Sequence, residues 1–385
     1  MIDVSTIGKL GFGCMRFIGR GSDSVDIDAV SKMIDRFLEG GGTYFDTAWA
    51  YPNSEKTLRA ALVDRHPRDA FQINSKCAAW IKCKGLDDVK RQMDTSLQTL
   101  GVDFFDFYMM HNLGGGRTQP FIDFKVWDWL HEMRDQGVVK HIGFSAHCMP
   151  DELEHFFNLF PDTELVTLQV NYVDWDNPAY RERENVAIAN AHNVPIVVME
   201  PVKGGMLANP PRAVKEILDE AMPGESYATT ALRFSASVPG VVCVLSGMST
   251  YEQVDENMHA FEDFKPFGDE EKAVFTKAQK AMVESGIVPC TNCGYCLKVC
   301  PANIGIPSSI AGLNYAINFE DNASGFAQMR TLVKFNEGRE FPTECTRCGA
   351  CEAACPQNLP ILDCFDRIVA ELIPAAQQRE PLIMV

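Results

Sequence analysis

The 385-residue sequence lacks any long uninterrupted apolar run, and it lacks an excess of positive charge. A membrane-spanning helix needs about 20 consecutive apolar residues, so no membrane partner is expected. The first residues show no basic segment followed by an apolar core, so we expect no signal peptide and predict a cytoplasmic protein. A net charge of −17 repels nucleic acid and anionic lipid, which argues against nucleic acid as a partner.

Several common nucleotide-binding and catalytic motifs are also missing. The sequence has no P-loop, no G-x-S-x-G motif and no glycine-rich dinucleotide fingerprint. Gly11 and Gly13 lie in the first apolar segment but do not open a helix, as that fingerprint requires. An open, doubly wound sheet therefore remains only the alternative fold.

Apolar segments that read as strands alternate with amphipathic helical segments over the first 260 residues. Eight strand candidates span 9–17, 43–48, 71–76, 104–111, 141–147, 165–172, 195–201 and 241–248. Helical segments lie between them, for example at 28–41, 86–101, 124–137 and 150–161. Buried strands separated by helices are typical of a parallel sheet, and eight such units in about 250 residues predict a closed (β/α)8 barrel.

Eight of the 14 cysteines form two runs near the C-terminus, each with the spacing C-x2-C-x2-C-x3-C-P. The runs are Cys290, Cys293, Cys296 and Cys300 before Pro301, and Cys345, Cys348, Cys351 and Cys355 before Pro356. Clustered cysteines in a cytosolic chain indicate metal ligands rather than disulfides. Zinc sites usually have one longer gap between two ligand pairs, so zinc is a weaker alternative.

The spacing resembles the run that binds [4Fe–4S] clusters in bacterial ferredoxins. In two-cluster ferredoxins the fourth cysteine of a run ligates the other cluster, so the resemblance implies two clusters with exchanged ligands. One would use Cys290, Cys293, Cys296 and Cys355, and the other Cys345, Cys348, Cys351 and Cys300. Such clusters can carry electrons or can serve only as structural staples, and both roles stay open.

These features divide the chain into three parts. We predict a barrel over residues 1–265, a helical linker over 266–285, and a small, mostly helical ferredoxin-like domain over 286–385. The stretch between the two cysteine runs contains two helical segments, SSIAGLNYAINF and GFAQMRTLVKFN.

The chemistry of such a barrel lies where the strands end at the C-terminal face. The second, third and fourth predicted strands end near Asp46, Lys76 and His111, and Tyr51 follows the second. A buried Asp–Lys pair beside a tyrosine can stabilise a phenolate, and such a phenol can protonate a carbonyl oxygen. A lone Asp–Lys pair is often only structural. The hypothesis of a catalytic site therefore depends on all four side chains lying at neighbouring strand ends.

The segments FDTAWAYPNSEKTLRAAL, INSKC and DFYMMHN resemble the aldo/keto reductase family over about residues 5–260. The resemblance implies that Asp46, Tyr51, Lys76 and His111 form the catalytic tetrad, with Tyr51 as the proton donor. With the cysteine runs included, the whole chain looks like the branch of this family that carries a ferredoxin-type domain.

The same resemblance implies a nicotinamide nucleotide cofactor. The candidate residues are Ser145 and Gln169 at the nicotinamide, and Gly247, Ser249, Gln253, Glu256 and Asn257 along the rest of the nucleotide. This chain has Ala146 where many members have Asn, and Met199 where many have an aromatic residue. NADP-dependent members often have Lys and Arg at the places of Gly247 and Gln253, so NAD(H) and NADP(H) both stay open.

Nicotinamide delivers two electrons together, whereas each cluster carries one. The main hypothesis is a carbonyl reductase for a small-molecule aldehyde or ketone, with clusters that are structural or that guide docking. The alternative is a single-electron reductase fed by a ferredoxin or another electron-transfer protein. A third possibility is an electron-transfer subunit of a larger complex. No flavin motif is present, but a barrel can bind FMN without one.

Overall fold

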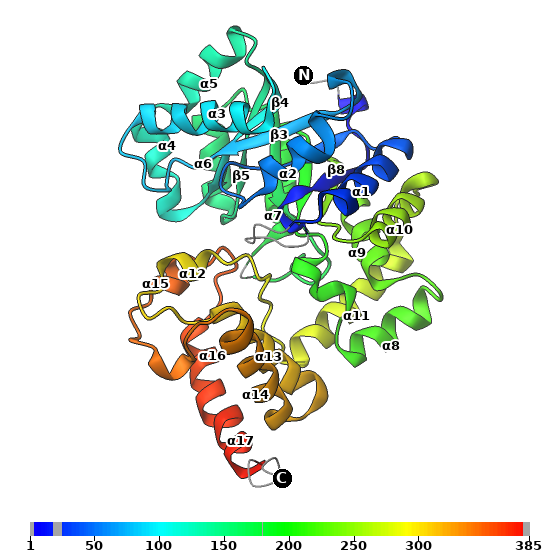
Figure 1. Cartoon of the computed structure of the whole chain (residues 1–385). Helices are drawn as coiled ribbons and strands as arrows, with labels where there is room; N and C mark the ends of the chain where they lie inside the picture. The colour runs from blue at the N-terminus through cyan, green and yellow to red at the C-terminus, as the bar shows by residue number, and fades with distance from the viewer. Residues whose placement is uncertain (1–3, 18–24, 179, 380–385) are drawn as a thin grey trace. The chain divides into compact units, whose positions relative to one another are not determined.

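The computed structural model describes residues 4–17, 25–178 and 180–379, and it contains a closed barrel of eight parallel strands (Figure 1). Strand order follows chain order, and β8 pairs with β1 to close the barrel. The strands are β1 (Leu10–Gly13), β2 (Tyr44–Asp46), β3 (Gln72–Cys77), β4 (Phe105–Leu113), β5 (Val139–Ala146), β6 (Leu165–Gln169), β7 (Ile196–Met199) and β8 (Val241–Ser246). The predicted (β/α)8 barrel is therefore confirmed, and the open sheet is wrong.

The strands form because both of their faces are buried. All nine residues of β4 are buried, as a strand requires when side chains fill the barrel on one face and helices cover the other. Tyr44, Phe107, Met109, Leu165 and Val197 come from four different strands and belong to one buried apolar cluster. The continuous apolar character of these segments is the sequence signal of that double burial.

Helices follow the strands around the barrel. They are α1 (Ile27–Glu39), α2 (Ser54–Leu58), α3 (Leu86–Leu100), α4 (Gln119–Asp123), α5 (Val126–Asp135), α6 (Pro150–Leu159), α7 (Glu182–Ala191), α9 (Tyr227–Ala236) and α10 (Tyr251–Glu262). In α1 the Asp26 side chain accepts the N–H of Ala29 and caps the helix, and Val30, Ile34 and Phe37 form its buried face. None of the helices in the described part of the chain is long and apolar enough to cross a bilayer.

Strands β1 and β6 end at least three residues earlier than their apolar sequence predicts. The first candidate ran to residue 17, but β1 stops at Gly13 because side chains satisfy the carbonyls beyond it. Ser54 Oγ donates to the carbonyl of Cys14 at 2.9 Å, and Ser249 Oγ donates to that of Arg16 at 2.8 Å. The sixth candidate ran to residue 172, but Asn171 Oδ1 accepts the N–H of Asp174 at 3.0 Å and turns the chain after β6.

The chain separates into two compact units. The first comprises Met1–Pro201 and Thr229–Phe267, and the second comprises Val202–Ala228 and Gly268–Val385. The segment that follows β7, with α8 (Arg212–Ala221), thus belongs to the second unit and contacts α11 (Asp269–Glu284) there. The domain boundaries drawn from the sequence at residues 265 and 286 stay predictions.

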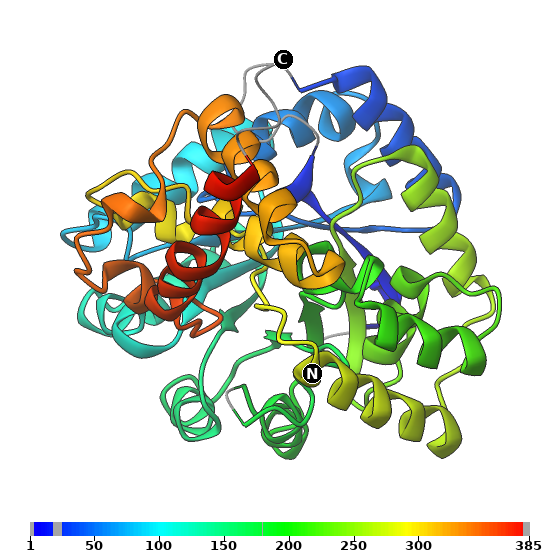
Figure 2. The ribbon, with the colours of Figure 1, turned by 90° about the horizontal axis from the view of Figure 1, so that it is seen from below.

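The second unit is helical and has a core of its own. Its other helices are α12 (Tyr295–Val299), α13 (Ile306–Phe319), α14 (Asn322–Arg330), α15 (Ala350–Ala353), α16 (Ile361–Arg367) and α17 (Ile373–Arg379). Figure 2 shows α13, α14 and α17 beside one another in orange and red, and contacts join α14 to both neighbours. Apolar residues of α13, α14 and α16 share one buried cluster with Cys296, Cys351 and Cys355, so the cysteine loops are part of this core.

Candidate functional site

A buried ion pair joins the ends of β2 and β3. Lys76 Nζ donates to both carboxylate oxygens of Asp46 at 2.7 Å and to the carbonyl of Thr47 at 2.8 Å. The side chains of Lys76 and Asp46 are only 2% and 7% exposed. Asn74 Nδ2 also donates to Asp46 Oδ1 at 2.7 Å, so the carboxylate is held from two sides. A fixed ammonium ion therefore lies at this end of the barrel.

Tyr51 and His111 lie around that ammonium ion. The Lys76 Nζ atom is 5.4 Å from the centre of the Tyr51 ring. The rings of Tyr51 and His111 meet edge to face with their centres 5.4 Å apart. His111 is 4% exposed on β4, and Tyr51 is half-buried in the loop after β2. The structure thus brings together all four side chains that the sequence placed at strand ends.

A second carboxyl group lies behind this quartet, and the sequence did not single it out. Glu55, on α2, accepts the hydroxyl of Ser75 at 2.8 Å and is 7% exposed. Burial raises the pKa of Glu55 above its usual value, against the opposing effects of its hydrogen bonds and of the Lys76 charge. A buried Glu on a short helix after a strand has no sequence signal that separates it from a surface residue.

Ser145 and Gln169, the candidates for the nicotinamide end, lie buried at the ends of β5 and β6. Ser145 Oγ accepts the N–H of Asn112 at 2.8 Å, and Gln169 Nε2 donates to Asp174 Oδ2 at 2.9 Å. Both side chains are therefore oriented by neighbouring residues. Ala146, next to Ser145, offers no side-chain hydrogen-bond donor where an Asn would.

The remaining nucleotide candidates surround the N-terminus of α10. Gln253 Oε1 accepts the N–H of Ser249 at 2.7 Å, and Thr250 caps the helix by accepting the N–H of Gln253 at 3.3 Å. Such a terminus carries a partial positive charge and free N–H groups, which suit a phosphate. Asn257 donates to Ser246 Oγ at 3.0 Å, so it fastens the helix to β8.

Glu256 also helps to hold α10 in place. It accepts the hydroxyl of Thr229 at 3.3 Å, which ties α10 to α9. The side chains of Glu256 and Asn257 therefore hold α10 in place. The N-terminal end of this helix is bordered by Gly247, Ser249 and Gln253.

Arg16 is the residue at this edge that the sequence analysis missed. A Cβ atom on Gly247 would lie 2.9 Å from Arg16 Cδ, and the Arg16 carbonyl accepts the Ser249 hydroxyl at 2.8 Å. The chain thus brings a guanidinium-bearing side chain to a loop whose own residues carry no positive charge. This donor set fits a phosphate group, although Gly247 and Gln253 carry no charge themselves.

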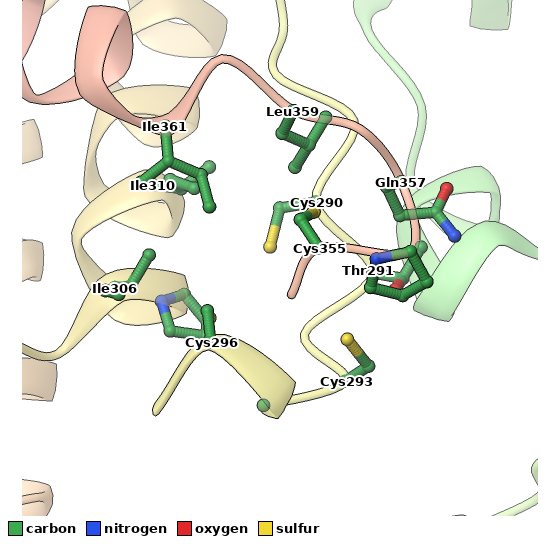
Figure 3. A pocket seen from close by; sticks show the side chains of 13 residues that line it. Cys290, Thr291, Cys293, Cys296, Ile306, Ile310, Cys355, Gln357, Leu359 and Ile361 are labelled. Atoms are coloured by element: carbon green, nitrogen blue, oxygen red, sulfur yellow. The ribbon is translucent and has the colours of Figure 1, made fainter. Parts of the chain in front are cut away.

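In the second unit the eight clustered cysteines line two separate cavities. The first, of about 330 Å³, is lined by Cys290, Cys293, Cys296 and Cys355, and Figure 3 shows their side chains around it. The second, of about 290 Å³, is lined by Cys300, Cys345, Cys348 and Cys351. Each cavity therefore takes its fourth cysteine from the other run, which is the exchange that the ferredoxin resemblance implies.

The chemistry of both linings fits a [4Fe–4S] cluster. Apolar side chains such as Ile306, Ile310 and Leu359 complete the first cavity. In the second, the N–H of Ile304 approaches Cys300 Sγ at 3.4 Å and that of Arg347 approaches Cys345 Sγ at 3.3 Å. Backbone donors to sulfur and an apolar shell are the features by which proteins tune such clusters.

None of the 14 cysteines, all of which lie in the described ranges, forms a disulfide. Over the same ranges, no three His, Cys, Asp or Glu side chains are grouped so that they could hold a single metal ion. Sulfur atoms spread around a cavity suit a cluster of several irons better than one ion.

Comparison with known proteins gives the same division of the chain. The model of the aldo/keto reductase family matches residues 9–280, and that of a 4Fe-4S dicluster domain matches residues 289–360. An aldo-keto reductase of Mycolicibacterium smegmatis is 26% identical over 259 residues, which cover 67% of this chain and 83% of that protein.

Solved structures resemble the barrel. The holo form of aldo-keto reductase AKR11C1 from Bacillus halodurans is 25% identical and has a TM-score of 0.58, over 70% of this chain and 91% of that one. An aldo/keto reductase from Klebsiella pneumoniae, solved in complex with NADP and acetate, is 17% identical. Its TM-score is 0.56 over 70% of this chain and 91% of that one, and at this identity it shows the fold alone.

Proposed function

Since the chain belongs to the aldo/keto reductase family and carries a 4Fe-4S dicluster domain, we propose that it reduces the carbonyl group of a small-molecule aldehyde or ketone. The observation that carries this proposal is the convergence of Asp46, Lys76, Tyr51 and His111 at one end of the barrel. A bound nicotinamide nucleotide would supply the hydride. The cysteine usage suits a reducing compartment, and we place the protein in the cytoplasm.

Tyr51 is the proposed proton donor to the carbonyl oxygen. Lys76 holds a positive charge beside the Tyr51 ring and stabilises the phenolate that remains when the proton leaves. Asp46 keeps that ammonium ion in place through two hydrogen bonds. His111, whose ring packs against Tyr51, is positioned to orient the substrate oxygen.

The nucleotide would lie along the ends of β5, β6 and β8. Ser145 and Gln169 would hold the nicotinamide amide, and Gly247, Ser249 and Gln253 would take the phosphates at the α10 terminus. Arg16 adds a charge there, which supports a phosphate-rich cofactor of either kind. Glu256 and Asn257 would act by holding α10 in place.

The eight clustered cysteines would hold two [4Fe–4S] clusters, which supply single electrons. Cys290, Cys293, Cys296 and Cys355 would bind the first, and Cys300, Cys345, Cys348 and Cys351 the second, because each set lines one cavity. We name these clusters I and II.

The test is a reduction assay on protein purified without oxygen, with a panel of aldehydes and ketones and with NADH or NADPH. Tyr51→Phe should lower kcat by about 10²–10⁴-fold, the range that general acid catalysis contributes, and should leave nucleotide affinity unchanged. Tyr227→Phe is the matched control, because its hydroxyl donates to the carboxylate of Asp219 at 2.9 Å in an exposed contact. Equal effects of the two variants would contradict the role of Tyr51.

The cysteine-lined cavities favour a second candidate function, a single-electron reductase fed by a ferredoxin or another electron-transfer protein. Anaerobic titration separates the two candidates. Nucleotide binding and hydride transfer that survive removal of the clusters support the carbonyl reductase. Absence of nucleotide binding, together with bleaching of the cluster absorbance by reduced ferredoxin, supports the single-electron enzyme, with or without a bound flavin.

A further inference from the structure

Tyr51, the proposed proton donor, lies in a short irregular segment between β2 and α2. Its N–H donates to the carbonyl of Ala48 at 3.0 Å, and its own carbonyl accepts the N–H of Ser54 at 3.3 Å. Tyr51 is therefore shared by two consecutive turns, one that leaves β2 and one that enters α2. The place of its ring depends on how these two elements are held.

Ser54 fastens the start of α2 to the ends of two strands. It is 2% exposed, and its Oγ donates to the carbonyl of Cys14, directly after β1, at 2.9 Å. The same oxygen shares a hydrogen bond with Oγ1 of Thr47, directly after β2, at 2.7 Å. One fixed point does not set the direction of a short helix, so a second contact is needed.

Glu55 supplies that second contact, and it reaches the strand that carries Lys76. Glu55 Oε1 accepts the hydroxyl of Ser75 at 2.8 Å. Ser75 is fully buried and directly precedes Lys76 in β3. Because side chains alternate along a strand, Ser75 points to the opposite face from Lys76, toward the surrounding helices. The bond thus joins the helix that follows Tyr51 to the neighbour of Lys76.

Stability alone does not account for a carboxyl group at this place. Burial raises the pKa of Glu55, so its ionised form makes the folded protein less stable. What a carboxylate provides is a strong acceptor, since hydrogen bonds to a charged group are shorter and stronger than those between neutral groups. Such a bond suits a contact whose geometry must be kept.

We propose that Glu55 is a positioning residue for the proton transfer: its hydrogen bond with Ser75 fixes α2 against β3 and so places the Tyr51 hydroxyl beside Lys76. The inference rests on the proposed function, because it assumes that Tyr51 is the proton donor. Glu55 acts through the turn that precedes it and not on the substrate. The proton moves from the Tyr51 hydroxyl to the carbonyl oxygen, and Glu55 neither gives nor takes one.

Glu55→Leu removes the acceptor and keeps most of the side-chain volume. A displacement of about 1 Å between reacting groups can cost about a hundredfold in rate. Because Ser54 still holds the start of α2, we expect a smaller displacement and a fall in kcat of about tenfold, with nucleotide affinity unchanged. Glu55→Gln should keep kcat within about threefold, because its amide oxygen can still accept from Ser75.

The experiment is a double-mutant cycle between Glu55→Leu and Tyr51→Phe, measured as kcat on the full chain with the aldehyde that the wild type reduces fastest. In the wild-type background Glu55→Leu should lower kcat about tenfold. In the Tyr51→Phe background it should lower kcat by less than about twofold, because the hydroxyl that it positions is gone. A purely structural role would produce the same loss in both backgrounds.

Asp106→Leu is the matched control. Asp106 is also a buried carboxyl group that binds β3, but it accepts the N–H of Ile73 at 2.9 Å, at the end of the strand away from Lys76. Its substitution should lower Tm and leave kcat unchanged. Should Glu55→Leu fail to fold, Ser75→Ala replaces it in the cycle, since it removes the same hydrogen bond by a smaller change.

Three results would overturn the inference: equal losses of kcat in both Tyr51 backgrounds, a loss in Asp106→Leu as large as that in Glu55→Leu, or a Glu55→Gln variant no more active than Glu55→Leu. The proposed function fails in a different way. A wild type that reduces no aldehyde or ketone, or a Tyr51→Phe variant as active as the wild type, would refute the proposed function and the role of Glu55 with it.

Discussion

Removal of the Lys76 ammonium ion should be among the most damaging single substitutions in the barrel. Lys76→Met leaves the carboxylate of Asp46, whose side chain is only 7% exposed, without its cation and leaves the Thr47 carbonyl without its donor. Loss of one partner of a buried ion pair typically costs about 3–5 kcal/mol. For a domain of 150–250 residues, this corresponds to a fall of about 6–20 °C in Tm.

The measurement is thermal unfolding of Lys76→Met, Asp46→Asn and the double variant, followed by circular dichroism. The double variant should recover at least half of the lost stability, because no buried charge remains unpaired while the amide introduced at position 46 can still accept from Asn74. It should not recover activity, because the cation beside Tyr51 is still missing. Stability and catalysis therefore respond differently to the same pair of changes.

Lys140→Met is the matched control. Lys140 pairs with Asp106 at 2.9 Å, but its side chain is 53% exposed and Arg68 also pairs with that carboxylate at 2.6 Å. Its loss should cost at most about 1 kcal/mol. A Lys76→Met variant no less stable than Lys140→Met would refute the reasoning, as would a double variant with wild-type kcat.

Three further substitutions test other parts of the molecule. Glu55→Gln should raise Tm at pH 7. Because burial raises the pKa of Glu55, ionisation of this carboxyl group destabilises the folded wild type as pH rises. The gain in Tm should therefore vanish below about pH 4.5, where the carboxyl group is protonated in both the folded and the unfolded state. A gain that persists in acid would contradict this. Arg16→Met should weaken nucleotide binding by about tenfold in a fluorescence titration, whereas Arg59→Met, at a surface arginine that pairs with Asp64, should not. Cys293→Ala should lower the iron content from about eight atoms per chain, and Cys364→Ala, outside both cavities, should leave it unchanged.

The barrel could be predicted because its signals are local. The strands are buried on both faces, so their apolar character is continuous, and the helices between them carry one apolar face each. Strand ends were harder to place. The chain leaves β1 at Gly13 because Ser54 and Ser249, distant in sequence, bind the next carbonyls, and no window around residue 13 contains that information.

The catalytic candidates were found for a related reason. In a parallel barrel every strand ends at the same face, so polar residues that follow consecutive strands must come close together. Asp46, Lys76 and His111 could therefore be grouped from position alone. The supports of the site could not: Glu55 and Arg16 reach it through contacts that depend on where their loops pack.

The amino-acid sequence was sufficient for the features that depend on local spacing. The cysteine runs, the eightfold alternation of strands and helices, and the order of the catalytic candidates along the chain all follow from periodicities of a few residues. The resemblance to two-cluster ferredoxins implied that the two runs exchange their fourth cysteines. Each of the two cavities is lined by three cysteines of one run and the fourth cysteine of the other.

Tertiary structure alone decided which distant residues meet. Lys203 lies 154 positions from Gln357, yet the two are joined by a hydrogen bond beside the first cavity, and Arg16 lies 233 positions from Ser249. The segment after β7 lies within residues 1–265, the range predicted for the barrel, but its contacts group it with the second unit. Such contacts arise because a folded chain minimises exposed apolar surface and unpaired polar groups over the whole molecule, and neither quantity can be read from a short stretch of sequence.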